Sequence, residues 1–225
     1  MSKPKLNVVA IDGPSGAGKS TVSSELAKAL GARLLDTGAT YRAAAYIALQ
    51  KKATSEKAFE RIARELDFKI SRDGKTLLVG GRNLGVRLRT ERVSQMASFI
   101  SQFKGVRKVI TSKQRSVARR CSRHNPVVVE GRDIGTVVFP DARHKFFVTA
   151  SPKVRAERRY EQLKARGVRV SLHSVLAEQA KRDKRDSTRA HAPLKCATDA
   201  IVVDTSEMTI KEVVGLLEKH IAGKT

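Results

Sequence analysis

The stretch GPSGAGKS occupies residues 13–20 and fits the pattern G-x-x-x-x-G-K-[ST]. Glycines in this spacing let the backbone curl so that successive N–H groups point inward at an anion. Lys19 adds a mobile positive charge for the β- and γ-phosphates, and the Ser20 hydroxyl can hold Mg²⁺. We therefore predict a site for nucleotide phosphates, formed by Gly13, Pro14, Ser15, Gly16, Ala17, Gly18, Lys19, Ser20 and Thr21.

The flanks of this loop distinguish it from a glycine-rich turn that arose by chance. Residues 7–11 (NVVAI) predict a buried strand, and residues 21–30 predict a helix with Val22, Leu26 and Leu30 on one face. The loop would then lie between a strand and a helix N-terminus, where the helix dipole also favours an anion.

Strands alternate with helices along the rest of the chain, without an internal repeat. Short apolar runs predict further strands at 33–36, 127–129, 145–149 and 201–203. We therefore predict an α/β fold with a doubly wound parallel sheet. A length of 225 residues suits one domain with a full core.

The predicted helices carry recognisable start signals. Ser55 and Ser151 are suitable N-caps, and Pro152 suits the first position of a helix. Arg42 lies in the first turn of its helix, where a cation is unfavourable, so it either serves an anion or is simply solvated. The helices are expected at 39–51, 55–66, 91–103, 105–123, 153–165, 172–185 and 210–221.

Residues 67–89 differ from the βα pattern around them. Alternating residues and the turn signals Asp73-Gly74 and Gly80-Gly81 predict a three-stranded antiparallel meander at 67–71, 76–79 and 83–88. Such an insert is a lid, a substrate-binding subdomain or an idle decoration.

The charge balance favours anionic partners. The chain has 45 basic and 22 acidic residues, a net charge of +23, which raises a nucleic-acid hypothesis. The charge is spread along the chain, however, and an aromatic content of 4% leaves few stacking platforms. We expect no specific nucleic-acid partner. One face of the helix at 105–123, extended by the residue before it, is basic. This face is either solvated or binds an anion, and it consists of Lys104, Arg107, Lys108, Arg115 and Arg119.

Cysteine and histidine usage indicates a reducing compartment without structural zinc. Cys121 and Cys196 have no C-x-x-C spacing, and the five histidines include no H-E-x-x-H. No apolar run approaches the length of a membrane span, and the N-terminus does not read as a signal peptide. We expect a cytoplasmic monomer that acts on small molecules.

Polar residues follow the strand at 127–129. Ligands bind at the carboxyl ends of strands in open α/β sheets. Glu130, Arg132 and Asp133 are therefore site candidates, although Arg132 and Asp133 could also form a plain ion pair.

Five motifs stand out along the chain: GPSGAGKS at 13–20, LDTGATYR at 35–42, EGRDIGTVVFPDA at 130–142, RAERR at 155–159 and R-D-x-R-D-x-x-R at 182–189. In this order and spacing they resemble the bacterial cytidylate kinases nearly end to end, including the β insert. Thr37 stands where that family often has Ser, and Glu130 where Asp is also found, so the hydroxyl and the carboxylate are kept.

The resemblance implies transfer of the γ-phosphoryl group of ATP, bound with Mg²⁺, to CMP or dCMP. It implies a P-loop core at 1–66 and 103–225, a monophosphate-binding insert at 67–102 and a helical lid at 153–170. By position, Ser98, Arg107 and Asp133 would face the cytosine. The resemblance also implies that the monophosphate is held by Arg42, Arg132 and Arg189, with Thr37 nearby. Arg182 and Asp186 would hold the ribose and phosphate region. The implied catalytic residues are Lys19, Arg132, Arg158 and Arg159.

Which of Arg158 and Arg159 reaches the phosphates stays open at this point. The alternatives are another P-loop kinase, acting on adenylate, guanylate or shikimate, and a nucleic-acid-coupled ATP-binding protein. The β insert and the GRD segment argue against the first, and only the net charge favours the second.

Overall fold

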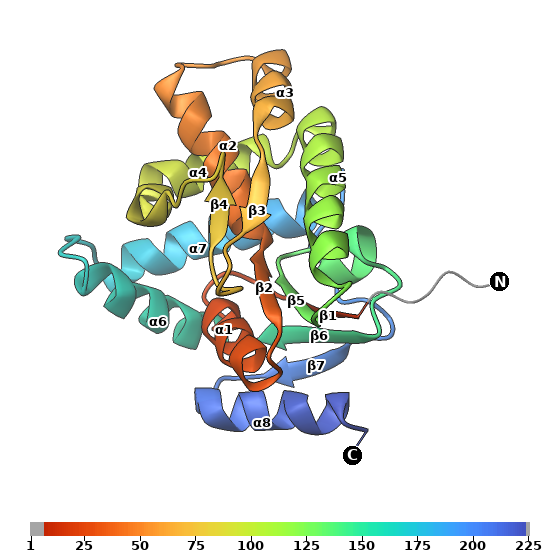
Figure 1. Ribbon diagram of the computed structural model, residues 1–225. Coiled ribbons are helices and arrows are strands. Elements are labelled where there is room, and N and C mark those ends of the chain that lie inside the picture. The colour runs from red at the N-terminus through yellow and green to blue at the C-terminus, as the bar shows by residue number, and fades with distance from the viewer. Residues whose placement is uncertain (1–6, 224–225) are drawn as a thin grey trace.

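The core of the protein is a five-stranded parallel sheet with the strand order β2-β5-β1-β6-β7 (Figure 1). The computed structural model describes residues 7–223. The parallel, doubly wound sheet is confirmed. Its strands are β1 (Val8–Asp12), β2 (Arg33–Asp36), β5 (Val127–Glu130), β6 (His144–Thr149) and β7 (Ile201–Asp204).

Alternate residues of the central strands face two separate hydrophobic layers. Val9 and Ile11 of β1 pack with α1 (Lys19–Ala29) and α8 (Ile210–Ile221), which contact each other; α8 lies below β7 in Figure 1. Val8 and Ala10 face the other layer, which includes residues of α2 (Thr37–Gln50) and α5 (Lys104–Cys121). Burial on both faces explains why the central strands read as continuous apolar runs.

The β insert has two strands rather than three. β3 (Phe68–Ile70) and β4 (Leu77–Val79) pair antiparallel, but the third predicted strand is wrong, because that segment contains the 3₁₀ helix η1 (Gly85–Arg89). After the turn, only one bridge forms, between Val79 and Arg82. Gly85 then adopts a φ of 50°, which ends the extended conformation.

The helices agree with the predicted set, with shifted ends. Asp36 caps α2, since its side chain accepts from the Ala39 N–H, and α2 therefore begins two residues before the predicted start. Ser55 and Ser151 are confirmed as N-caps. The remaining helices are α3 (Glu56–Glu65), α4 (Glu91–Ile100), α6 (Pro152–Lys164) and α7 (Leu172–Thr188).

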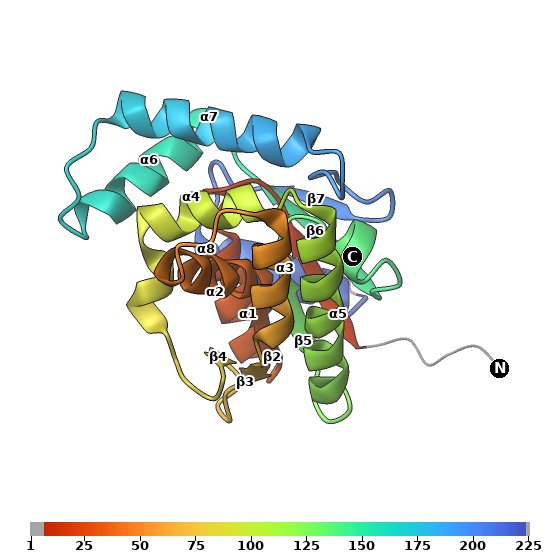
Figure 2. The same ribbon diagram turned by 90° about the horizontal axis from the view of Figure 1, so that it is seen from above.

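Helices α6 and α7 pack against each other and run side by side along one edge of the molecule, next to α4 (Figure 2). Their own small apolar cluster consists of Ala156, Leu163 and Val175. No helix within residues 7–223 is long and apolar enough to cross a membrane.

The predicted basic face of α5 divides into two kinds of residue. Lys104, Lys108 and Arg119 are exposed. Arg107 is buried, and Arg115 donates to the backbone carbonyls of Val137 and Val138. The face is therefore only partly solvated.

Candidate functional site

The phosphate loop follows β1 and leads directly into α1. Gly13 has a φ of 144°, and a Cβ there would lie 1.9 Å from the Val148 carbonyl oxygen, so only glycine fits. Lys19 is buried, and its Nζ donates to the Pro14 carbonyl at 2.6 Å. Burial, and then the charge of Arg132, lowers the pKa of Lys19. An ammonium held this way is placed to bind a phosphate anion.

A carboxylate at the end of β5 lies beside the start of α1. The Ser20 hydroxyl donates to Glu130 Oε2 at 3.0 Å, and the Thr37 hydroxyl donates to the Glu130 carbonyl at 2.7 Å. Burial, with the nearby charge of Asp36 adding to it, raises the pKa of Glu130 from 4.5 to about 7. A hydroxyl and a carboxylate together offer the oxygen ligands that Mg²⁺ prefers.

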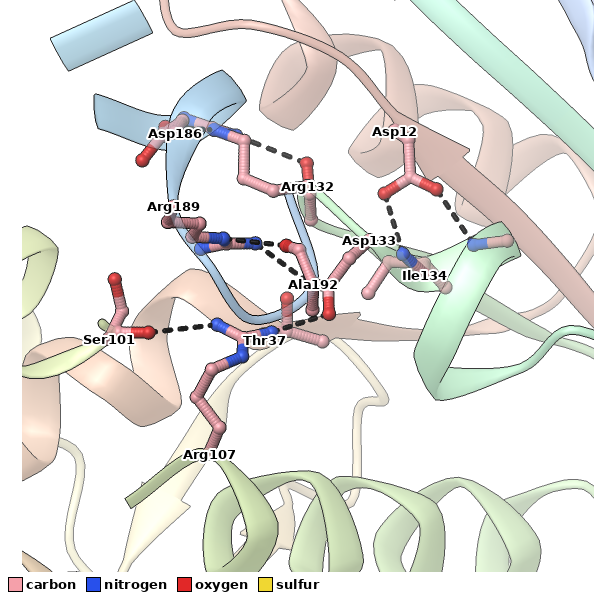
Figure 3. Close-up of polar contacts among 12 residues, drawn as sticks. Asp12, Thr37, Ser101, Arg107, Arg132, Asp133, Ile134, Asp186, Arg189 and Ala192 are labelled. Carbon is pink, nitrogen blue, oxygen red and sulfur yellow. Dashed lines mark hydrogen bonds and ion pairs between the residues drawn. The ribbon is translucent and has the colours of Figure 1, made fainter. Parts of the chain in front are cut away.

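The loop after β5 places Asp133 between two arginines (Figure 3). Arg107 of α5 pairs with Asp133 Oδ2 at 2.5 Å and also donates to the Ser101 carbonyl. Arg189, just after α7, lies 3.5 Å from Asp133 Oδ1. All three side chains are buried, so a carboxylate and two guanidiniums form a polar cluster away from solvent.

The ion pair between Arg132 and Asp133, the alternative to their role as site residues, is not formed among residues 7–223. Arg132 instead pairs with Asp186 of α7 at 3.1 Å, and Arg42 pairs with Asp36 at 2.5 Å (Figure 3 shows the first). Both arginines carry other free N–H groups, which could meet a phosphate.

Arg182 is one of three site arginines, with Arg42 and Arg189, that have a buried nitrogen without a hydrogen-bond partner within residues 7–223. In Arg182 this nitrogen is Nε. Burial, and then the charge of Arg132, lowers its pKa from 12.5 to about 10. Such a charge is costly until an anion arrives.

Helix α6 directs its arginines to three different places. Arg155 is buried and donates to the Ala150 and Ser15 carbonyls and to Asp183. Arg158 donates to the Thr205 hydroxyl at 2.9 Å, beside the end of β7. Arg159 pairs with Glu91 at the start of α4 at 2.8 Å.

The structure brings five of the predicted residues into one neighbourhood: Lys19, Arg42, Arg132, Arg159 and Arg182. The charge of Arg132 acts on Lys19 and Arg182, and the charges of Arg42 and Arg159 act on Arg182. Ser98 of α4 is buried and is reached by Arg185 Nη1 at 2.9 Å. Arg158 does not join this group and lies near Gly18 and the end of β7.

Sequence reasoning did not assign roles to Asp12, Asp36, Arg155 or Arg185. Asp12 and Asp36 each end a parallel strand, and that position was an available signal. Arg155 and Arg185 lie within quoted motifs, but nothing in a motif shows which arginine is buried.

Comparison with known proteins gives a consistent match over almost the whole chain. A family model described as "Cytidylate kinase" matches residues 9–222. A cytidylate kinase of Citrifermentans bemidjiense is 42% identical over 95% of this chain and 92% of its own length. One of Thermodesulfovibrio yellowstonii is 44% identical over 96% of this chain and 97% of its own length.

Among solved structures, a crystal structure of an uncharacterized protein from Eubacterium ventriosum is similar with a TM-score of 0.53. It is 13% identical and covers 97% of this chain and 99% of its own. At that identity the likeness concerns the fold alone.

Proposed function

Because this chain belongs to the cytidylate kinase family, it uses ATP to phosphorylate CMP and dCMP, and we propose that the cluster described above is its active site. The observation that carries this proposal is the position of the buried Asp133, which Arg107 and Arg189 hold. Its neighbour Ile134 is hydrogen-bonded to Asp12, the residue before the phosphate loop. A base-reading pocket and a donor-phosphate site must be neighbours, since phosphoryl transfer needs the two nucleotides in line.

The proposed donor site is the phosphate loop, residues 13–21. Its backbone N–H groups and Lys19 would hold the β- and γ-phosphates of ATP. The Ser20 hydroxyl, with the Glu130 carboxylate 3.0 Å away, fits the oxygen ligands of a Mg²⁺ ion. Bound there, the metal would neutralise charge on the phosphates.

The proposed base-reading residues are Asp133, Arg107 and Ser98. Cytosine presents a donor at its 4-amino group and acceptors at N3 and O2. A carboxylate accepts from the amino group, and a guanidinium or a hydroxyl donates to the acceptors. The pocket is buried, so a base with the wrong pattern would leave polar groups unpaired.

Arginines would hold the monophosphate and the sugar. Guanidinium groups suit phosphate because they bind it in a fixed two-pronged geometry. Arg132 and Arg42 are already oriented by Asp186 and Asp36. We assign Arg42, Arg132 and Arg189 to the monophosphate, with Thr37 nearby, and Arg182 with Asp186 to the ribose and phosphate region.

The lid would be residues 153–170, which comprise most of α6 and the loop that leads to α7, and it would exclude water from the phosphates when it closes. We assign Arg159 to the transferring phosphate, because its charge acts on Arg182. Arg158 lies at the end of β7 beside Thr205, which suits the nucleoside end of ATP. Both remain proposals for the closed state.

The proposed subdomains are the core, 1–66 and 103–225, and the insert, 67–102. The η1 and α4 segments of the insert pack on α2 of the core. We propose a monomer that acts on the small molecules ATP and CMP or dCMP. We propose that the enzyme acts in the cytoplasm, where ATP and CMP are found. We propose no specific nucleic-acid partner.

An acceptor panel tests the proposal. ATP consumption is coupled to a spectroscopic signal with CMP, dCMP, UMP, AMP or GMP as acceptor. We expect rapid turnover with CMP and dCMP and much slower turnover with the others. Faster turnover with AMP or GMP would overturn the assignment of the pocket, and ATP hydrolysis stimulated only by RNA would overturn the kinase site itself.

A further inference from the structure

Asp12, the last residue of β1, joins the phosphate loop to the base-reading loop. Its side chain is 4% exposed. One carboxylate oxygen accepts from the Ile134 N–H at 2.8 Å and the other from the Gly135 N–H at 2.7 Å (Figure 3). Asp12 immediately precedes Gly13 of the phosphate loop, and Ile134 immediately follows Asp133.

The two N–H groups need an outside acceptor. Ile134–Val138 is a short π-helical turn, and the first N–H groups of any helix lack intrahelical partners. Asp133 stands at the N-cap position, but its side chain makes no cap hydrogen bond, because it is directed at Arg107 and Arg189. Asp12 therefore supplies the cap that Asp133 would otherwise supply.

We propose that Asp12 is a positioning residue: by capping the turn in place of Asp133, it keeps the Asp133 carboxylate free to select cytosine. The inference rests on the proposed role of Asp133 as a base reader. If the cap is lost, the Asp133 carboxylate can fold back onto its own turn, as Asp commonly does at an N-cap. Selectivity would then fall more than catalysis in general.

The surroundings of Asp12 make this arrangement sensitive to pH. Burial raises the pKa of Asp12 from 3.8 to about 6, and the two N–H groups and Lys19 oppose the rise while Asp133 adds to it. Lys145 of β6 packs against the same turn at Gly135, and the Asp12 charge also acts on the Cys196 thiol. Protonation of Asp12 turns one acceptor oxygen into an O–H group facing an N–H, which breaks one hydrogen bond.

The test measures the ratio of kcat/KM for CMP over UMP. Both substrates carry the same 5′-monophosphate, so its titration cancels in the ratio. Loss of one hydrogen bond, about 1 kcal/mol, corresponds to roughly fivefold. We expect the wild-type ratio to fall about two- to threefold between about pH 7.5 and about pH 5.5, since about three quarters of Asp12 is protonated at the lower value. Asp12→Asn should have a low ratio at both values, with no inflection.

Asp199→Asn is the matched control. Asp199 pairs with Lys145, so this substitution removes a carboxylate from the other side of the turn but leaves the Ile134 and Gly135 N–H groups capped. Its ratio should equal that of the wild type at each pH. Retention of the wild-type ratio and pH profile by Asp12→Asn would overturn the inference.

Two further outcomes separate a failed inference from a failed active-site proposal. If Asp133→Asn leaves the CMP-over-UMP ratio unchanged, the base-reading proposal itself is wrong. If Asp133→Asn lowers the ratio while Asp12→Asn lowers both efficiencies equally, Asp12 is only structural and the inference is wrong. The wild-type pH profile requires no variant, so a flat profile overturns the inference even if Asp12→Asn does not fold.

Discussion

Lys19 is the residue on which phosphoryl transfer should depend most directly. Its Nζ donates to the Pro14 carbonyl, and the positive charge of Arg132 lowers its pKa along with burial. An arriving phosphate supplies the anion that this ammonium lacks. We expect Lys19→Ala to lose at least about a hundredfold in kcat, comparable to the loss of one transition-state donor. Coupled assays would measure the rate, and circular dichroism would show whether the variant is folded. Near-normal turnover would mean that this loop does not take part in catalysis.

Asp133 should determine the choice between CMP and UMP. Uracil has an oxygen where cytosine has its amino group and a proton on N3, so Asp133 would face a lone pair and Arg107 a donor. A good bidentate pair provides about 1–3 kcal/mol of discrimination, and about 1.4 kcal/mol is tenfold. We expect Asp133→Asn to lower the CMP-over-UMP ratio of kcat/KM by roughly tenfold or more.

The competing role for Asp133 is purely to hold its arginine neighbours. Asp133 pairs with Arg107 and Arg189, whereas Arg132 pairs with Asp186. If Asp133 only orients those arginines, Asp133→Asn would lower the efficiencies for CMP and UMP together. A constant ratio would therefore remove it from the base-reading residues.

The residue types of the site were predictable, but their pairings were not. The phosphate loop follows from a contiguous motif, and its strand–loop–helix context is confirmed. Arg132 and Asp186 are 54 residues apart, and Arg107 and Asp133 are 26 apart. No local pattern determines which carboxylate each arginine meets, because that depends on how the helices pack over the sheet.

At the scale of elements, local chemistry predicted helix ends better than it predicted the β insert. Ser55, and Ser151 with Pro152, act within one turn of the backbone and were assigned correctly. The predicted third strand of the insert does not form, because a strand needs a hydrogen-bonded neighbouring strand along its length. Beyond Val79–Arg82, η1 instead packs on α2.

The two lid arginines of α6 should respond differently to substitution. Arg159 pairs with the partly exposed Glu91, whereas Arg158 is held by the Thr205 hydroxyl and carbonyl. A contact made with phosphate only in the closed state appears in kcat rather than in KM. We expect Arg159→Ala to lower kcat by roughly tenfold or more with little change in the KM for CMP, and Arg158→Ala to raise the KM for ATP.

Glu91→Gln is the control for this pair. It removes the ion pair of Arg159 but leaves the guanidinium free, so kcat should stay within about twofold of the wild type, as expected for an exposed ion pair. Steady-state kinetics with each substrate varied in turn would decide. If Arg159→Ala changes only the KM for CMP, this arginine belongs to the acceptor site and the lid assignment is wrong.

Across the whole molecule, part of the high positive charge is structural. Lys113 donates to the carbonyls of Arg64 and Leu66, and Arg120 donates to that of Phe68. These cations join α5 to the end of α3 and to β3. Together with the site arginines, they account for a share of the +23 charge without a nucleic-acid partner.

The convergence of arginines on one site should cost stability, and Arg182 provides the clearest test. The folded chain holds the charged form of Arg182 less well than the unfolded chain, because its pKa falls from 12.5 to about 10. Around neutral pH the side chain is charged in both states, so the cost is present throughout. Arg182→Met keeps much of the packing and removes the charge, while Asp186 retains its pair with Arg132.

We expect Arg182→Met to raise the Tm and to lose kinase activity. A gain of about 1–2 kcal/mol would raise the Tm by roughly 2–8 °C for a chain of this size. Differential scanning calorimetry without nucleotides at about pH 7.5 would measure it. Lys184→Met, an exposed position on the same helix, is the matched control and should leave both Tm and activity near those of the wild type. An unchanged or lower Tm for Arg182→Met would mean that Asp186 already compensates the buried charge, and that the cluster binds anions without a stability cost to the fold.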